Sequence, residues 1–439
     1  MAEYLPFILF GLVFLLILFG YPVAFTLGGL SIIAGLLYFD LDFFYLLSLR
    51  IYGTMNNFVL MAVPLFVFMG IMLEKSGLAE SLLETMAMLF GKLKGGLAIS
   101  VVIVGGMLAA STGIVGATVI TMGMISLPTM LKRGYSTELA TGVIASSGTL
   151  GQIIPPSVVL VLLGSVLNVS VGDLFTAAIV PGIILVGLYL IYIVVIAAIK
   201  PEIAPCIDEE ERKEFWSEGA AKNIIYAFVF PFMLILVVLG SIFAGIASPT
   251  EAAAVGAIGA IFLTILQKKF SLQILKDVMR DTTFLTCMVF VILIGATSFS
   301  LVFRGMGGDR LLSEIITGAN LSPNVFLALV LLVVFIAGFF IDFIEIIFII
   351  VPVAAPIFAA LGIDLVWIGI LIALNLQTSF LTPPFGFSLF YLKGVAPPEV
   401  KTSQLYRGII PFVIIQLLLL ILVIVFPELV SFLPELLEK

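Results

Sequence analysis

The feature that most restricts the fold of this chain is a series of long apolar runs separated by short polar segments. Many of them match or approach the roughly 20 residues that a helix needs to cross the hydrocarbon core of a bilayer. Of the 439 residues, 62% are hydrophobic and only 11% are charged, which is too little polar surface to cover a water-soluble globule. The sequence therefore predicts an all-α polytopic membrane protein. The clearest runs are Leu5–Tyr38, Ile224–Ile246, Phe284–Phe303 and Ile409–Phe426.

The chain contains no histidine, which removes several kinds of catalytic and metal site. Ser-His pairs, HExxH zinc sites and histidine proton relays are excluded. Cys206 and Cys287 lack metal-ligand spacing, and no GxxxxGK[ST] loop for ATP occurs. We therefore expect no enzyme activity and no cofactor beyond coupling ions, and no nucleic-acid partner. An intramembrane aspartyl protease is the remaining enzyme hypothesis, but Gly305–Asp309 misses its GxGD motif by one residue.

Fixed spacings between prolines divide the chain into two similar halves. Pro128 and Pro356 are 228 residues apart (356 − 128), and the Pro155-Pro156 pair lies 228 residues before Pro383-Pro384 (383 − 155). Repeats of this kind are typical of secondary transporters, in which the two halves insert with opposite orientation. Residues 1–199 form the first predicted inverted repeat, 200–222 a charged cytoplasmic linker, and 223–439 the second repeat.

Each half contains a paired apolar segment with a polar centre, at residues 97–131 and 325–361. Basic residues flank the first pair at both ends, whereas the loops beside the second pair contain no Lys or Arg. By the positive-inside rule, the first pair enters and leaves on the cytoplasmic side and the second on the opposite side. We therefore predict two re-entrant hairpins of opposite polarity in a multi-pass protein of a bacterial-type inner membrane.

Each half also contains a helix interrupted by its proline pair, at residues 138–168 and 365–392. Proline removes a backbone donor, so carbonyls upstream lose their helical partners. Such a break is tolerated at membrane depth only where the freed groups are buried, wet or bound to an ion. We predict a sodium site where each break meets a hairpin tip. The predicted ligands are Ser111, Gly113, Ser147, Gly151 and Ile154 in the first site, and Gly338, Ser379, Thr382 and Phe385 in the second.

A simpler alternative stays open for both breaks. The prolines would only kink packed helices, and the hydroxyl groups would bond to the carbonyl four residues earlier in the same helix. Elsewhere, the segment from Ser248 to Glu251 fits the start of a capped helix.

The second hairpin tip carries Asp342 and Glu345, where a charge at the bilayer centre is expensive and usually functional. Asp342 would add charge to the ion site or guard the substrate path, whereas we expect Glu345 to reach water. No cluster of Lys or Arg lies within the apolar runs, so helix N-termini and hydroxyl groups would hold a substrate carboxylate. The predicted substrate ligands are Ser146, Ser157, Thr378 and Asp342.

Several segments resemble the large membrane subunit of tripartite ATP-independent periplasmic (TRAP) transporters. The similarity covers nearly the whole chain and is carried by Asn57–Phe66, Gly151–Ser157, Ala247–Ala254 and Asn375–Gly386. It implies an elevator-type carrier of the ion-transporter superfamily, coupled to sodium and moving a small organic anion. It also implies a small four-helix membrane partner and a periplasmic substrate-binding protein.

The resemblance gives a preference among substrates, and two other interpretations stay open. Thr378 and its neighbours stand where many relatives have a glycine near Ser379, which disfavours sialic acid and favours dicarboxylates or other small organic acids. A stand-alone sodium/anion symporter would share the same fold without needing a binding protein. A purely structural scaffold would have no reason to carry two symmetrical broken helices.

Overall fold

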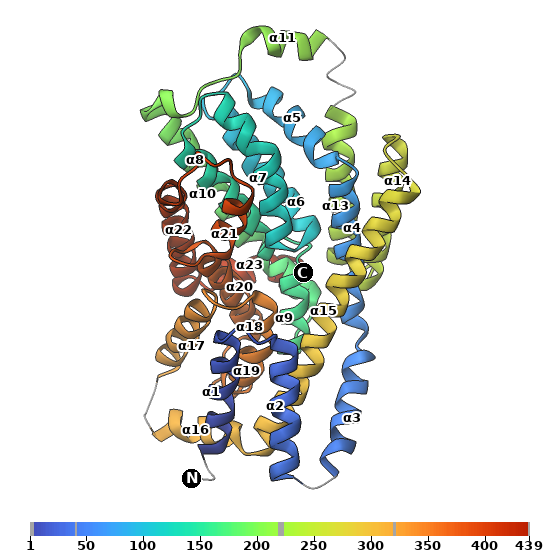
Figure 1. The fold of residues 1–439 in the computed structure, drawn as a ribbon, viewed down its shortest axis with the longest axis vertical. Helices are drawn as coiled ribbons and strands as arrows, with labels where there is room; N and C mark the ends of the chain where they lie inside the picture. Colours follow the sequence, from blue (N-terminus) through green and yellow to red (C-terminus); the bar gives the residue numbers. More distant parts are fainter. Residues whose placement is uncertain (1–3, 40–41, 218–223, 319–321, 438–439) are drawn as a thin grey trace.

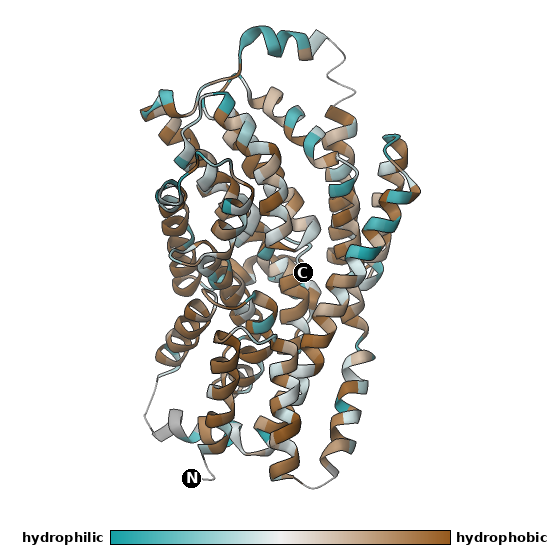
Figure 2. Cartoon of the chain, in the orientation of Figure 1, coloured by the Kyte–Doolittle hydropathy of each residue, from teal (hydrophilic) through white to brown (hydrophobic). Residues whose placement is uncertain are grey.

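The computed structural model describes residues 4–39, 42–217, 224–318 and 322–437 (Figure 1). Within these ranges every regular element is a helix. Seven of the described helices are long and apolar enough to cross a membrane, or eight if a pair bent by 49° is counted as one span. Figure 2 shows hydrophobic residues along most of their length.

The first half runs from α1 to α10. Its helices are α1 (Leu5–Leu18), α2 (Val23–Tyr38), α3 (Asp42–Met55), α4 (Ala62–Lys75), α5 (Leu78–Phe90), α6 (Gly96–Thr112), α7 (Val115–Lys132), α8 (Thr137–Thr149), α9 (Val158–Leu167) and α10 (Val171–Ile199), with 3-10 turns η2 (Phe58–Met61) and η3 (Leu150–Gln152).

The second half follows a short connecting segment. The connection contains η4 (Pro201–Ile203) and α11 (Glu209–Ser217). The helices after it are η5 (Ile225–Val229), α13 (Phe230–Phe243), α14 (Pro249–Leu266), α15 (Leu272–Gly305), α16 (Gly308–Gly318), α17 (Pro323–Ala337), α18 (Phe343–Ile349), α19 (Val351–Ala360), α20 (Leu365–Leu381), α21 (Phe387–Val395), α22 (Thr402–Val425) and α23 (Glu428–Leu437).

Local sequence signals explain where many of these helices begin. A serine hydroxyl accepts a hydrogen bond from the first turn and so satisfies a backbone donor that the helix itself leaves free. At α14 the cap is reciprocal, because the Glu251 carboxylate also accepts from the Ser248 backbone at 2.8 Å. The predicted cap at this helix is confirmed. The serine caps are Ser136, Ser157, Ser170, Ser248, Ser271 and Ser322.

Two helical hairpins enter the molecule from opposite ends (Figure 1). Helices α6 and α7 come from the end that carries α11 and turn at Gly113, whose φ of +64° suits a residue without a Cβ. Helix α17 and the bent pair α18–α19 come from the end that carries α16. The structure therefore has the all-helical fold with two hairpins and two interrupted helices that the sequence predicts.

The charged linker predicted between the halves contains a helix in its described part. Residues 209–217 form helix α11, and Glu211 on this helix makes a bidentate ion pair with Arg133. The two guanidinium nitrogens of Arg133 lie 2.9 Å and 2.6 Å from the carboxylate oxygens of Glu211. The acidic residues of its first turn suit a helix N-terminus, which explains why so polar a stretch forms a helix.

The hairpins and interrupted helices pack in a reciprocal way. The first arm of each hairpin contacts the interrupted helix of its own half, α6 on α8 and α17 on α20. The second arm reaches across, because α7 packs on α21 while α18 and α19 pack on α9. Both tips and both breaks therefore meet in one interior region.

Candidate functional site

The two breaks interrupt their helices in similar ways. The first runs from the 3-10 turn η3 to the start of α9, and the second from the end of α20 to the start of α21. Both proline pairs contain a cis peptide bond. Some of the carbonyls that lose a helical donor find a new one. The carbonyl of Gln152 accepts from the Ser157 hydroxyl at 2.9 Å, and that of Ser379 accepts from the Thr382 amide at 3.1 Å. The carbonyls of Gly151 and Phe380 also stand four residues before a proline, which has no backbone hydrogen to donate to them.

The first hairpin tip packs directly on the first break. A Cβ atom on Gly113 would lie 2.5 Å from Val158 Cγ2, and one on Gly151 would collide with the Ala109 backbone. Ser147 similarly fills the space beside Gly105 of α6. Two of the predicted sodium ligands, Gly113 and Gly151, thus line the contact between tip and break, and Ser147 packs against α6 about one turn before Gly151.

At the second contact the glycine belongs to the hairpin, whereas at the first contact Gly151 belongs to the break. Gly338 lies against the side chain of Ser379. Aromatic rings close the contact, since Phe340 and Phe385 have centroids 5.1 Å apart and Phe343 and Phe380 lie 6.4 Å apart. The structure thus brings Gly338, Ser379 and Phe385 together at one contact.

The remaining predicted sodium ligands lie at the edges of these contacts or outside the described side chains. The Thr382 hydroxyl donates to the Thr378 carbonyl at 2.7 Å, at the end of α20. The Ile154 side chain faces α10 near Gly182, which leaves only its backbone for the site. Ser111 lies in the last turn of α6, and its side chain is outside the described part of the structure.

Most hydroxyl groups at the breaks donate their hydrogen to the backbone of their own helix. Ser146 and Ser147 bond to carbonyls three residues earlier, at 3.1 Å and 3.0 Å, and Thr378 to the Leu374 carbonyl at 2.7 Å. The Ser379 hydroxyl donates to the Leu376 carbonyl at 2.9 Å. The simpler alternative predicted bonds to the carbonyl four residues earlier; Thr378 makes such a bond, whereas the three serines bond three residues earlier in the same helix. This bonding leaves each oxygen with lone pairs and no free hydrogen, which suits a cation better than a carboxylate.

The two carboxylates at the second tip form a helix cap. Asp342 accepts from the Phe343 amide at 2.8 Å, and Glu345 accepts from the Asp342 amide at 2.8 Å. Both side chains are half-buried, so the expectation that Glu345 is an ordinary solvated carboxylate is wrong. Its position three residues after Asp342 makes it a capping partner, because the free backbone N–H groups at the start of α18 need acceptors.

Three polar side chains at or next to the breaks were not predicted as ligands. Gln152 and Gln377 are fully buried, and among the described residues neither side-chain amide atom of either one has a hydrogen-bond partner. The hydroxyl of Ser388, in the first turn of α21, is also buried and unpaired within the described part. The signal that could have found the glutamines is a neutral amide inside an apolar helix with no charged neighbour in sequence.

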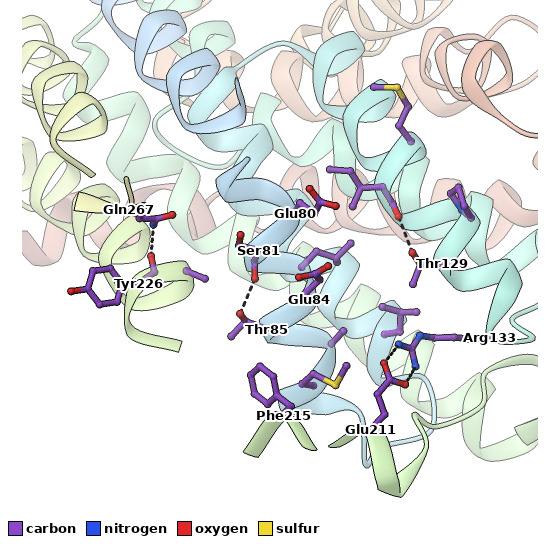
Figure 3. Close-up of a pocket in the computed structure, with 18 of the residues that line it drawn as sticks. Glu80, Ser81, Glu84, Thr85, Thr129, Arg133, Glu211, Phe215, Tyr226 and Gln267 are labelled. Carbon is purple, nitrogen blue, oxygen red and sulfur yellow. Dashed lines mark hydrogen bonds and ion pairs between the residues drawn. The ribbon is translucent and has the colours of Figure 1, made fainter. Parts of the chain in front are cut away.

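A cleft of about 910 Å³ opens at the end that carries α11 (Figure 3). In Figure 3, Glu80, Ser81 and Glu84 of α5 lie in the middle of the lining, with Tyr226 and Gln267 on one side and Arg133 and Glu211 on the other. Gln267 donates to the Tyr226 carbonyl at 2.7 Å. The Arg133–Glu211 ion pair also lines the cleft. Hydrogen bonding to Arg133 holds the pKa of the Glu211 carboxyl below its ordinary value.

Comparison with known proteins decides the family. Residues 10–429 match the model of the DctM component of the tripartite ATP-independent periplasmic transporters. This chain belongs to that family. It is 32% identical to the C4-dicarboxylate TRAP transporter large permease protein DctM of Vibrio cholerae, covering 98% of this chain and 97% of the relative. The sialic acid TRAP transporter large permease protein SiaM of the same organism is 30% identical over 88% of each chain.

The fold is also found in a solved transporter structure. The YdaH transporter of Alcanivorax borkumensis aligns with a TM-score of 0.63 over 92% of this chain and 96% of its own, at 16% sequence identity. At that identity the likeness concerns the fold alone. Membership in the TRAP family makes the chain a multi-pass inner-membrane transporter subunit and not an enzyme, as the sequence predicts.

Proposed function

We propose that this TRAP large permease imports small organic acids, in particular dicarboxylates, and that a sodium gradient drives the import. The observation that carries the proposal is the meeting of each hairpin tip with a broken helix whose hydroxyl groups have already donated their hydrogens. Oxygens in that state can act only as acceptors, which is the requirement for ligands of a hard monovalent cation.

The proposed sodium sites use the residues at the two contacts. In the first, Ser147 supplies a hydroxyl oxygen, Gly113, Gly151 and Ile154 supply carbonyls, and Ser111 belongs to the same tip. In the second, Ser379 and Thr382 supply hydroxyl oxygens, with carbonyls from Gly338 and Phe385. Sodium would join tip to break in each half, and the ordered tips would enclose the substrate between them.

We further propose that transport follows an elevator mechanism. The hairpins and interrupted helices would move together, because α7 packs on α21 and α18 packs on α9 across the two halves. The cleft between α5, α7 and α14 offers space for such a movement at the end predicted to be cytoplasmic. The family description names a tripartite transporter. We propose that the other two parts are a small four-helix membrane subunit and a periplasmic substrate-binding protein.

Uptake into proteoliposomes tests the proposal. The large subunit would be reconstituted with its small membrane subunit, and radiolabelled succinate, malate, fumarate and sialic acid offered with and without binding protein under an imposed sodium gradient. The expected result is dicarboxylate uptake that requires both sodium and the binding protein. Uptake with sodium alone would identify a stand-alone symporter, and uptake without a sodium gradient would refute sodium coupling.

A further inference from the structure

We infer that Gln152, Gln377 and Ser388 form the subsite that binds the carboxylate of the transported acid. The inference rests on the proposed function, because it names the groups that would hold an organic anion between the two breaks. Its starting point is that these three side chains are fully buried and unpaired within the described part of the structure.

The packing of the helices brings the segments that carry the two glutamines into contact. The turn η3, which carries Gln152, packs on α20, the helix that carries Gln377. Helix α21, which begins one residue before Ser388, packs on both α7 and α8. All three therefore lie at or next to the breaks, where the two tips converge.

A buried amide without a partner is expensive, so its retention in an apolar interior calls for a ligand. An unsatisfied donor or acceptor of this kind has lost its hydrogen bonds to water and has gained none in the protein. Each glutamine has two N–H hydrogens, and the two amides together offer four, which matches the four acceptor positions of one carboxylate. The Ser388 hydroxyl offers one further hydrogen.

Other candidates for the anion site are weaker. Within the described residues no lysine or arginine side chain is fully buried, so a cation cannot hold the carboxylate in the interior. The predicted ligands Ser146, Ser157 and Thr378 each donate their hydrogen to a backbone carbonyl. Asp342 carries the same charge as the substrate and caps α18. Neutral amides remain as the donors.

The chain offers a matched control for the glutamines. Gln416 of α22 is also buried, but it lies outside both breaks and its amide is next to the Tyr189 hydroxyl. Methionine has a similar length and no hydrogen-bonding hydrogen, so Gln→Met fills the same space while removing the donors. Because the amides have no protein partner to lose, Gln152→Met and Gln377→Met should leave the melting temperature unchanged or raise it.

The test is the reconstituted system above, with the full complex and radiolabelled succinate, or the panel acid that wild-type protein takes up best. We expect Gln152→Met and Gln377→Met each to raise the KM for the acid at least tenfold, equivalent to about 1.4 kcal/mol. The sodium concentration for half-maximal uptake should stay within about twofold of wild type. Gln377→Glu should raise the KM further, because it places a negative charge beside the carboxylate.

Three outcomes would overturn the inference while leaving the proposed function intact. The first is an unchanged KM in both methionine variants. The second is a shifted sodium requirement with an unchanged KM, which would assign the amides to an ion site. The third is an equal rise in KM for Gln416→Met, which would reduce the effect to a general response to losing a buried amide. Absence of acid uptake by wild-type protein would instead overturn the proposed function and, with it, the inference.

Discussion

Replacing Gly338 by alanine is expected to weaken sodium binding by displacing the second hairpin tip. A Cβ at this position would lie 2.8 Å from the Cβ of Ser379, which the α20 backbone holds in place. Carbon atoms in contact rest about 3.5–4.0 Å apart, so the tip has to move by about 1 Å. Overpacking of this kind costs about 1–3 kcal/mol. If sodium binding must restore the native contact, the sodium concentration for half-maximal uptake rises about 5- to 140-fold.

A second substitution separates packing from ion ligation. The first half already carries an alanine in the tip and a glycine in the break, Ala109 against Gly151, and Gly338→Ala with Ser379→Gly reproduces that arrangement. The double variant should regain the melting temperature lost by Gly338→Ala. It should not regain wild-type sodium affinity, because the Ser379 hydroxyl is gone. In a double-mutant cycle, contacting residues of this kind couple by about 0.5–3 kcal/mol.

The measurements are thermal unfolding of the purified protein and the sodium dependence of initial uptake rates. Gly187→Ala in α10 serves as the control, because a Cβ there meets nothing within 4 Å. The reasoning is refuted if Gly338→Ala behaves like Gly187→Ala in both assays. It is also refuted if Ser379→Gly fails to restore the stability of the Gly338→Ala variant.

Three further predictions concern other contacts. Thr382→Ala should raise the half-saturating sodium concentration of uptake while Thr382→Ser does not, since only the hydroxyl is proposed as a ligand; equal effects of both would remove it from the site. The lowered pKa of Glu211 means that its pairing with Arg133 is present at neutral pH and persists below the pH at which an unpaired glutamate protonates. Hydrogen exchange of α11 should therefore stay slow through mild acid in wild-type protein and be fast throughout in Arg133→Gln. Gly142→Ala should lower the melting temperature far more than Gly187→Ala, because its Cβ would strike the Gly408 carbonyl where α8 crosses α22.

Features set by local chemistry were predictable from the sequence. The breaks fall where the proline pairs remove donors, and the cap at Ser248 forms because serine and glutamate stand three residues apart. Hairpin polarity followed from basic residues beside the first pair and their absence beside the second. These signals act over a few residues, so a single sequence contains them in full.

Features that depend on tertiary packing were not predictable. Glu345 has the spacing of a capping partner, but only the structure shows that its half-buried carboxylate accepts a hydrogen bond from the Asp342 amide. The rotamer that its neighbours allow decides which group each hydroxyl meets, so the sequence could not show that Ser146 and Thr378 bond to carbonyls of their own helix. Nor does any local pattern state that α7 packs on α21 of the other half.

That cross-packing bears on how the two proposed sodium sites act together. Gly116 and Gly123 of α7 lie against Tyr391 and Leu392 of α21, so the arm behind the first tip rests on the helix that follows the second break. The arm behind the second tip rests on α9, which follows the first break. An ion that orders one tip therefore acts on a helix bordering the other site. By linkage, the second ion must act equally on the first. Sodium coupling in this fold would thus be a property of the pair of sites and not of either site alone.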